Sequence, residues 1–263
     1  MKKRLLLLSN STNSGEGYLF YAQQQLNRFL GKSVNTILFI PFAGVILTGD
    51  DNFVSVTSTY NKYTEKVGRA FKDIGYEINA LHVAENPNDL IKKAEAIVVG
   101  GGNTFHLLHQ LYVTEVIETI REKINNGTPY IGWSAGANIA CPTLRTTNDM
   151  PIIEPRSFNG LNLVPFQINP HHPEQVLSNH YEETIEIKIT KKEIETRERR
   201  IEEFLAVNPD VYVVGLREGT MLNIEDSSIR LIGNKKMRLF KFGEKPAEYD
   251  SNANLDFLLN SIK

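Results

Sequence analysis

Cysteine is nearly absent from this sequence, since Cys141 is the only one in 263 residues. A single cysteine excludes an internal disulfide framework and a cysteine-rich metal site. Such low usage is also what a reducing compartment favours. We therefore expect a cytoplasmic protein without disulfide bonds.

The sequence also lacks a strong charge imbalance and any long apolar run. Lys and Arg total 29 against 31 Asp and Glu, a formal net charge of −2, which predicts no general affinity for nucleic acid or anionic membranes. The apolar run 5–8 after the basic start is too short for the core of a signal peptide. No stretch approaches the roughly 20 apolar residues that span a bilayer. We expect a soluble protein with neither membrane nor nucleic-acid partners, acting as a monomer or a homodimer.

Short apolar segments alternate with amphipathic ones through the first two-thirds of the chain. The short segments are apolar nearly throughout and bounded by turn residues, which is typical of buried strands, and the amphipathic ones have helical spacing. This alternation predicts an α/β fold with a mostly parallel sheet covered by helices on both sides. The predicted strands are 5–8, 36–40, 77–83, 96–99 and 130–133, and the predicted helices are 17–30, 60–74, 87–94 and 114–125.

The final third has a different pattern, a charged helix over 191–207 followed by short strands joined by tight turns. Antiparallel strands added to one edge of the sheet would explain it. No internal repeat, low-complexity tract or linker is visible, so residues 1–263 are predicted to form a single domain. The four predicted edge strands are 211–216, 221–224, 229–232 and 237–242.

Residues 132–136 read Gly-Trp-Ser-Ala-Gly, a G-x-S-x-G pattern between an apolar strand and an alanine-rich helix start. In that context the turn pushes a serine hydroxyl out at the carboxyl edge of a sheet, and the flanking glycines allow close packing. The pentapeptide alone is a weak signal, because Gly, Ser and Ala also meet in ordinary turns. The strand before it and the helix after it favour Ser134 as a nucleophile.

Three glycines, Gly100 to Gly102, directly follow the strand 96–99. Their backbone N–H groups are accessible, so Gly101 or Gly102 together with Ala135 can stabilise an oxyanion. A phosphate-binding loop and a purely structural turn are the competing interpretations, although the Lys and Ser/Thr of a P-loop are absent. The following Asn103 or Thr104 is placed to cap the next helix, and Asn103 is also a substrate-binding candidate.

A nucleophilic serine needs a base that is oriented by a carboxylate. Of the six histidines, the adjacent pair His171 and His172 follows the strand-like segment 164–168, near the sheet edge predicted for Ser134, and His171 is slightly preferred. Adjacent histidines project differently and no acidic motif accompanies them, so no metal site is predicted. Asp149 and Glu218 are both plausible orienting carboxylates, and spacing does not choose between them.

With these residues assembled, the sequence resembles peptidase E, the aspartyl dipeptidase family of serine peptidases. The resemblance implies a three-layer α/β/α sandwich, flavodoxin-like and related to class I glutamine amidotransferases, with antiparallel C-terminal edge strands. It also implies hydrolysis of dipeptides with an N-terminal aspartate, without metal or cofactor. The matching segments are 5–12 (LLLLSNST), 39–44, 97–105, 130–152, 163–171 (LVPFQINPH), 195–201 (ETRERRI) and 213–219.

Carried over residue by residue, the resemblance assigns the nucleophile to Ser134 and the base to His171. It assigns the third member to either Asp149 or Glu218 and leaves that choice open. An aspartyl side chain calls for a cation, for which Arg145 and Arg197 are the candidates because Arg binds carboxylates bidentately. The segments 45–61 and 174–193 are longer than expected for the family, and either is a candidate lid or oligomer contact.

Two rival functions stay open from the sequence. One is a cyanophycinase-like hydrolase, a relative with the same kind of serine turn that acts on β-aspartyl peptides. The other is a flavodoxin-like module that binds a phosphate-bearing ligand through the glycine loop and catalyses nothing. The closeness of the central block 130–152 to peptidase E favours the dipeptidase over the first rival, and the presence of Ser134, His171, Asp149 and Glu218 counts against the second.

Overall fold

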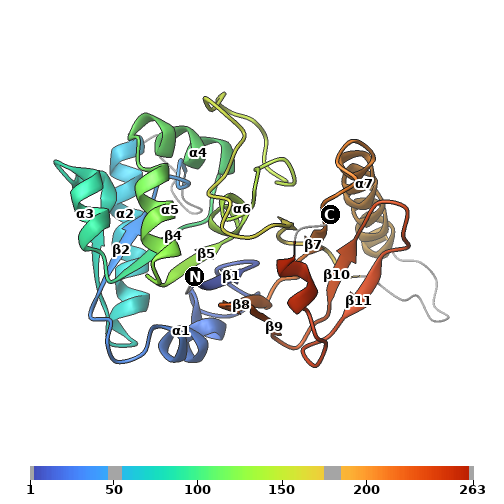
Figure 1. The fold of residues 1–263 in the computed structure, drawn as a ribbon, viewed down its shortest axis with the longest axis horizontal. Coiled ribbons are helices and arrows are strands. Elements are labelled where there is room, and N and C mark those ends of the chain that lie inside the picture. The colour runs from blue at the N-terminus through green and yellow to red at the C-terminus, as the bar shows by residue number, and fades with distance from the viewer. Residues whose placement is uncertain (1–2, 47–54, 175–184, 261–263) are drawn as a thin grey trace.

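The computed structural model has an α/β fold built on two sheets (Figure 1). It describes residues 3–46, 55–174 and 185–260. The larger sheet has seven strands in the order β3-β2-β4-β5-β1-β8-β9. Its first five strands run parallel, and β8 and β9 continue the β1 edge as an antiparallel hairpin. The bounds are β1 Arg4–Leu8, β2 Thr36–Ile40, β3 Glu77–Ala80, β4 Ala96–Val99, β5 Tyr130–Trp133, β8 Met221–Glu225 and β9 Ser228–Ile232.

Helices cover both faces of the larger sheet, which makes it the middle layer of a three-layer sandwich. Side chains alternate along a strand, so Leu5 and Leu7 of β1 pack in one core cluster and Leu6 and Leu8 in the other. The first cluster holds the apolar faces of α3, α4 and α5, and the second holds those of α1 and α2. The bounds are α1 Gln23–Leu30, preceded by the short helix η1 Phe20–Ala22, then α2 Val56–Lys72, α3 Pro87–Lys93, α4 Thr104–Val113, α5 Ile117–Asn125 and α6 Ala135–Ile139.

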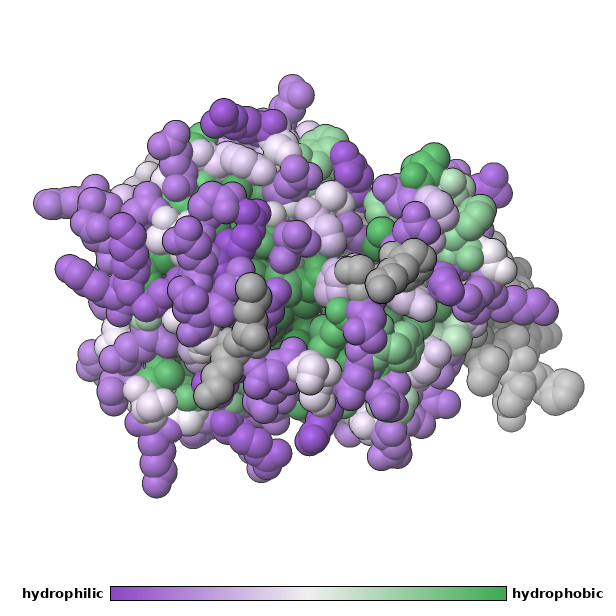
Figure 2. Space-filling model, viewed as in Figure 1, coloured by the Kyte–Doolittle hydropathy of each residue, from purple (hydrophilic) through white to green (hydrophobic). Residues whose placement is uncertain are grey.

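Local sequence signals account for the positions of these helices. The Asn86 side chain accepts a hydrogen bond from the Asp89 N–H, and Pro87 occupies the first helical position of α3. In α5, Ile117, Ile120 and Ile124 form the buried stripe. Figure 2 accordingly shows mainly hydrophilic residues over α3 and α5, with hydrophobic residues gathered nearer the middle of this face. Among the described residues, no helix has both the length and the apolar character to cross a bilayer.

The second sheet has four strands in the order β11-β10-β7-β6 and lies beside the first (Figure 1). β6 and β7 are parallel, and β10 pairs antiparallel with both β7 and β11. Helix α7, Ile185–Val207, packs on this sheet through Ile201 and Leu205, which contact Val213 and Phe240. The bounds are β6 Gln167–Asn169, β7 Val213–Gly215, β10 Met237–Phe240 and β11 Ala247–Tyr249, and the short helix η3 Asp256–Leu259 follows.

The predicted fold class is confirmed, and the bounds of β2, β4 and β5 match the predicted strands residue for residue. Several other predicted bounds differ from the structure by a few residues, and two predictions about strands were wrong. The strand predicted over 77–83 ends at Ala80, and Leu81–Val83 forms the short helix η2. The strands predicted over 211–216 and 237–242 do not extend the edge of the first sheet, because β7 pairs with β10 and β6, and β10 pairs with β7 and β11. Strand pairing is non-local, so the apolar pattern identified the strands without identifying their partners.

Candidate active site

Ser134 occupies a strained turn between β5 and α6. Its backbone angles are φ 52° and ψ −110°, which a non-glycine residue rarely adopts. The turn closes tightly: a Cβ on Gly132 would lie 2.4 Å from the Gly136 carbonyl oxygen, and one on Gly136 would lie 2.3 Å from that of Val99. The two glycines of the G-x-S-x-G pattern are therefore required by backbone packing. The result is the sharp strand-to-helix turn that presents a serine hydroxyl at the edge of a sheet.

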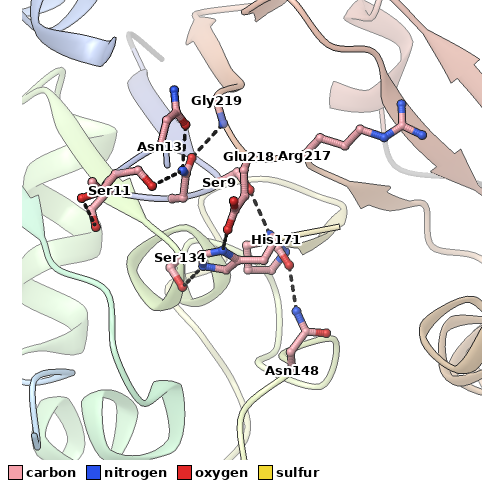
Figure 3. Close-up of polar contacts among 12 residues, drawn as sticks. Ser9, Ser11, Asn13, Ser134, Asn148, His171, Arg217, Glu218 and Gly219 are labelled. Carbon is pink, nitrogen blue, oxygen red and sulfur yellow. Dashed lines mark hydrogen bonds and ion pairs between the residues drawn. The ribbon is translucent and has the colours of Figure 1, made fainter. Parts of the chain in front are cut away.

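The imidazole of His171 lies between the hydroxyl of Ser134 and the carboxylate of Glu218 (Figure 3). Its Nε2 is 2.9 Å from Ser134 Oγ, and its Nδ1 is 2.6 Å from Glu218 Oε1. The hydrogen bond to His171 holds the pKa of Glu218 below its usual value, against the opposing effect of burial. A carboxylate, an imidazole and a hydroxyl in this order form the hydrogen-bonded chain of a catalytic triad.

The three side chains reach one place because the strands that carry them end at neighbouring edges. Ser134 follows β5 of the first sheet, whereas His171 and Glu218 follow the parallel strands β6 and β7 of the second. Parallel strands present their carboxyl ends at the same edge, where open α/β sheets usually bind ligands. The site thus lies where the two sheets meet.

Ser9, directly after β1, links His171 to the first sheet through hydrogen bonds. The His171 N–H donates to Ser9 Oγ at 2.9 Å, and the Ser9 hydroxyl donates to the Leu216 carbonyl oxygen at 2.7 Å. The backbone of His171 has φ 53°, so this residue is also strained. Sequence reasoning missed Ser9, although it lies in the segment LLLLSNST and directly follows a predicted core strand.

The structure separates the two candidate carboxylates. Asp149 Oδ2 accepts hydrogen bonds from the Thr104 N–H at 2.7 Å and from the Thr104 hydroxyl at 2.5 Å, so this side chain caps the start of α4. Glu218 is the one that contacts His171. Their spacing in the sequence favoured neither acid as the residue that orients the histidine, and only their positions in the fold distinguish them.

The structure also distinguishes His171 from the other histidines. His172 is buried, with Nδ1 3.2 Å from Asn169 Oδ1 and its ring against Phe240. Burial, followed by the charge of Arg217, lowers the pKa of His172 to about 3. His82, His106 and His109 each contact an atom elsewhere in the chain, and His180 lies outside the described residues. No group of three or more His, Cys, Asp or Glu within the described ranges is arranged to hold a metal.

The glycine loop after β4 lies against the serine turn. A Cβ on Gly101 would lie 3.0 Å from Ser134 Cβ, and Gly102 has φ +135° with the Ala43 carbonyl oxygen 2.1 Å from its virtual Cβ. Only glycine fits the second position. In the described part of the chain, the N–H groups of Gly101, Gly102 and Ala135 have no protein acceptor. They are available beside the Ser134 hydroxyl, as an oxyanion hole requires.

A cavity of about 300 Å³ opens beside Ser134. One wall is aromatic and hydrogen-bonded: the Trp133 indole donates to the Tyr63 hydroxyl at 3.1 Å, and that hydroxyl donates to the Gly101 carbonyl oxygen at 3.0 Å. The ammonium of Lys66 lies 4.6 Å from the centre of the Tyr18 ring. Sequence analysis singled out none of these aromatic residues, nor Lys66. The lining residues are Ser11, Tyr18, Gly44, Ile46, Tyr63, Lys66, Gly101, Gly102, Trp133, Ser134 and His171.

The predicted substrate-binding residues lie in three different places. Asn103 caps α4, accepting from the His106 N–H at 3.0 Å. Arg145 is exposed, with its guanidinium over the Phe158 ring. Arg197, from α7, donates to the carbonyl oxygen of His171. Of the three, only Arg197 contacts the Ser134–His171–Glu218 chain within the described residues.

Comparison with known proteins identifies the family. Residues 5–232 match the family model described as peptidase family S51. The chain is 62% identical to a peptidase E of Nostoc sp. over 98% of both chains, and 42% identical to a peptidase E of Haemophilus influenzae over 89% of this chain and 97% of the relative. A crystal structure of a peptidase from an acI-B1 Actinobacterium shares the fold, with a TM-score of 0.66 at 17% identity over 97% of each chain. The chain belongs to peptidase family S51, the peptidase E family, and is a serine peptidase.

Proposed function

We propose that this peptidase hydrolyses dipeptides with an N-terminal aspartate through an acyl-enzyme on Ser134. The observation that carries the proposal is the continuous chain from Ser134 Oγ through the His171 ring to Glu218 Oε1. The peptidase E relatives, which match nearly the whole chain, support the reaction class. The family resemblance supplies the aspartyl preference.

In the proposed first half-reaction, Ser134 Oγ attacks the carbonyl carbon of the aspartyl residue while His171 Nε2 takes the hydroxyl proton. Glu218 fixes the Nδ1–H tautomer of the ring and stabilises the imidazolium that forms. His171 then gives the proton to the leaving amine as the C–N bond breaks, which leaves the aspartyl ester on Ser134. Water, deprotonated by the same ring, resolves the ester to free aspartate and restores the hydroxyl.

The proposed oxyanion hole consists of the N–H of Gly101 or Gly102 and the N–H of Ala135. Ala135 begins α6, but that helix is short, so we assign the effect to its N–H group rather than to a helix dipole. One such donor is worth about 3–4 kcal/mol in comparable sites. The tight contacts of the glycine loop with Ala43 and Ser134 support the assignment, because they fix where these donors lie.

Arg197 is the better supported of the two proposed cations for the aspartyl carboxylate. Its guanidinium already reaches the backbone of His171, whereas Arg145 lies over Phe158. The test compares hydrolysis of Asp-Leu and Asn-Leu by Arg197→Met and by Arg145→Met. A preference for Asp-Leu that falls only in Arg197→Met supports this role, and an unchanged preference removes Arg197 from it.

The proposed function is tested by hydrolysis of an Asp-X dipeptide panel with purified protein, and Ser134→Ala as the matched inactive control. Including β-aspartyl peptides distinguishes the dipeptidase from a cyanophycinase-like hydrolase. Covalent labelling by a fluorophosphonate tests the non-catalytic alternative, since a module without a reactive serine stays unlabelled.

We also propose that the enzyme works in the cytoplasm, as a monomer or a homodimer. The support comes from the composition and from burial: the chain has a single cysteine, that cysteine is buried, and the net charge is close to zero. Light scattering after size-exclusion chromatography tests the assembly, and cell fractionation tests the location.

A further inference from the structure

Arg217 is the immediate neighbour of Glu218, yet its side chain points away from His171 (Figure 3). Its guanidinium is buried, and it makes a bidentate ion pair with Glu248 of β11, with N–O distances of 2.6 and 2.7 Å. It also donates to the carbonyl oxygen of Lys236 at 2.8 Å and, at 3.5 Å, to that of Pro173, in the segment that follows His171. One buried side chain thus ties both triad segments to the far edge of the second sheet.

The ion pair continues into a network of four residues, Arg217, Glu248, Arg238 and Glu198. Arg238, on β10, lies 3.2 Å from Glu248 Oε1 and 2.9 Å from Glu198 Oε1 on α7. Burial raises the pKa of Glu198 despite Arg238, whereas the two arginines outweigh burial and lower the pKa of Glu248. The network therefore joins β10, β11 and α7 to the loop that carries Glu218.

The two ends of this network adjoin the residues that touch His171. Arg217 precedes Glu218, which contacts the ring, and Glu198 follows Arg197, which contacts the His171 carbonyl oxygen. Between the two ends, the His172 N–H donates to the Leu216 carbonyl oxygen at 3.0 Å. A shift in the network would therefore displace the groups on both sides of the imidazole.

Stability alone is a poor explanation for so many buried charges. Taking charges out of water is costly, and apolar residues of similar volume often serve as well or better. What the planar, bidentate pair provides is a fixed geometry. Glu218 needs a rigid support of this kind, because half of its own side-chain surface is exposed and loop packing alone does not hold it.

We propose that the network of Arg217, Glu248, Arg238 and Glu198 positions Glu218 against His171, and that Arg217 is its principal positioning residue. The inference rests on the proposed function, in which Glu218 orients the base. The network does not touch the reacting atoms and acts only through Glu218 and the backbone of His171.

The test compares Arg217→Met and Glu248→Gln with Arg230→Met, which removes an exposed arginine from β9 of the first sheet. Because the network acts through Glu218, losing it should cost no more than losing the Glu218 charge, so we expect kcat to fall by about 10- to 30-fold in the first two variants, with KM within about twofold. Arg217→Lys, which keeps the positive charge without the bidentate geometry, should have a higher kcat than Arg217→Met.

Combining Arg217→Met with Glu218→Gln separates positioning from general damage. If Arg217 acts through Glu218, adding Arg217→Met to Glu218→Gln changes kcat by less than about twofold. An equal fall in both backgrounds, or a folded Arg217→Met enzyme with native kcat, overturns the proposal. Should Arg217→Met fail to fold, Glu248→Gln decides by the same criteria.

An NMR measurement keeps this inference distinguishable from the proposed function. In catalytically silent Ser134→Ala protein, the resonance of the His171 Nδ1–H that contacts Glu218 should move upfield in Glu248→Gln, because the hydrogen bond lengthens, and Arg230→Met should leave it in place. An unmoved resonance in Glu248→Gln overturns the positioning role. Absence of Ser134-dependent hydrolysis in the unmodified enzyme would instead overturn the proposed function, and the resonance would still report on the network.

Discussion

Replacing Glu218 with Gln removes the charge beside His171 while nearly preserving size. The bond lost is the charge-assisted contact of 2.6 Å to His171 Nδ1. Hydrogen bonds to charged groups contribute about 1.5–3 kcal/mol, and because half of the Glu218 side chain is exposed we take the lower part of that range, about 1.5–2 kcal/mol. Since 1.36 kcal/mol is a factor of ten in rate, kcat should fall by about 10- to 30-fold.

The matched variant is Asp149→Asn, which perturbs the other candidate carboxylate. Asp149 caps α4 through Thr104, so this change should lower the free energy of unfolding by about 1 kcal/mol and change kcat by less than about threefold. Steady-state kinetics on an Asp-X dipeptide and urea unfolding of both variants provide the comparison. A larger loss of kcat in Asp149→Asn than in Glu218→Gln, with both proteins folded, would refute the assignment of Glu218.

Three further predictions concern the surrounding structure. Burial first, and then the charge of Arg217, lowers the pKa of His172 to about 3, so the unfolded chain binds this proton more readily between about pH 6.5 and 3. The free energy of unfolding is therefore unaffected by His172 above that window and falls by about 1.4 kcal/mol per pH unit within it. His172→Phe should flatten the pH dependence of urea unfolding in that window, and an unaltered slope would contradict this. Gly102→Ala places a Cβ against the Ala43 carbonyl oxygen at positive φ and should cost at least about 100-fold in kcat, the loss expected when one oxyanion donor moves; a variant with native kcat would exclude this loop from the oxyanion hole. If residues 1–263 form one domain, Trp133 fluorescence and far-UV circular dichroism should report the same urea midpoint, whereas two separated midpoints would indicate two units.

Local sequence patterns were sufficient to locate the sharp turn that carries Ser134 and most of the strands. Ser134 lies between an apolar strand and a helix, and the backbone contacts of Gly132 and Gly136 explain why the pattern needs both glycines. The glycine loop was identifiable for the same reason, because its backbone conformation excludes side chains. Such features depend on residues adjacent in the chain, where sequence reasoning works best.

The partners of Ser134 depend on contacts between distant segments. Glu218 and Asp149 both follow structured elements, and only the pairing of β6 with β7 brings Glu218 to the imidazole. Ser9 contacts His171 across more than half of the chain, and Arg217 looks like an ordinary charged residue until the position of Glu248 is known. The long segments noted after 45 and 174 fall partly on 47–54 and 175–184, outside the described residues.

In the proposed reaction, Ser134, activated by His171, forms an acyl-enzyme during hydrolysis of Asp-X dipeptides. The most direct measurement is steady-state hydrolysis of Asp-Leu by the purified protein and by Ser134→Ala, with Asn-Leu as the comparison substrate. We expect turnover of Asp-Leu by the unmodified enzyme, clear discrimination against Asn-Leu, and a fall in kcat of several decades in Ser134→Ala with KM little changed. Near-native turnover by folded Ser134→Ala would exclude Ser134 as the nucleophile.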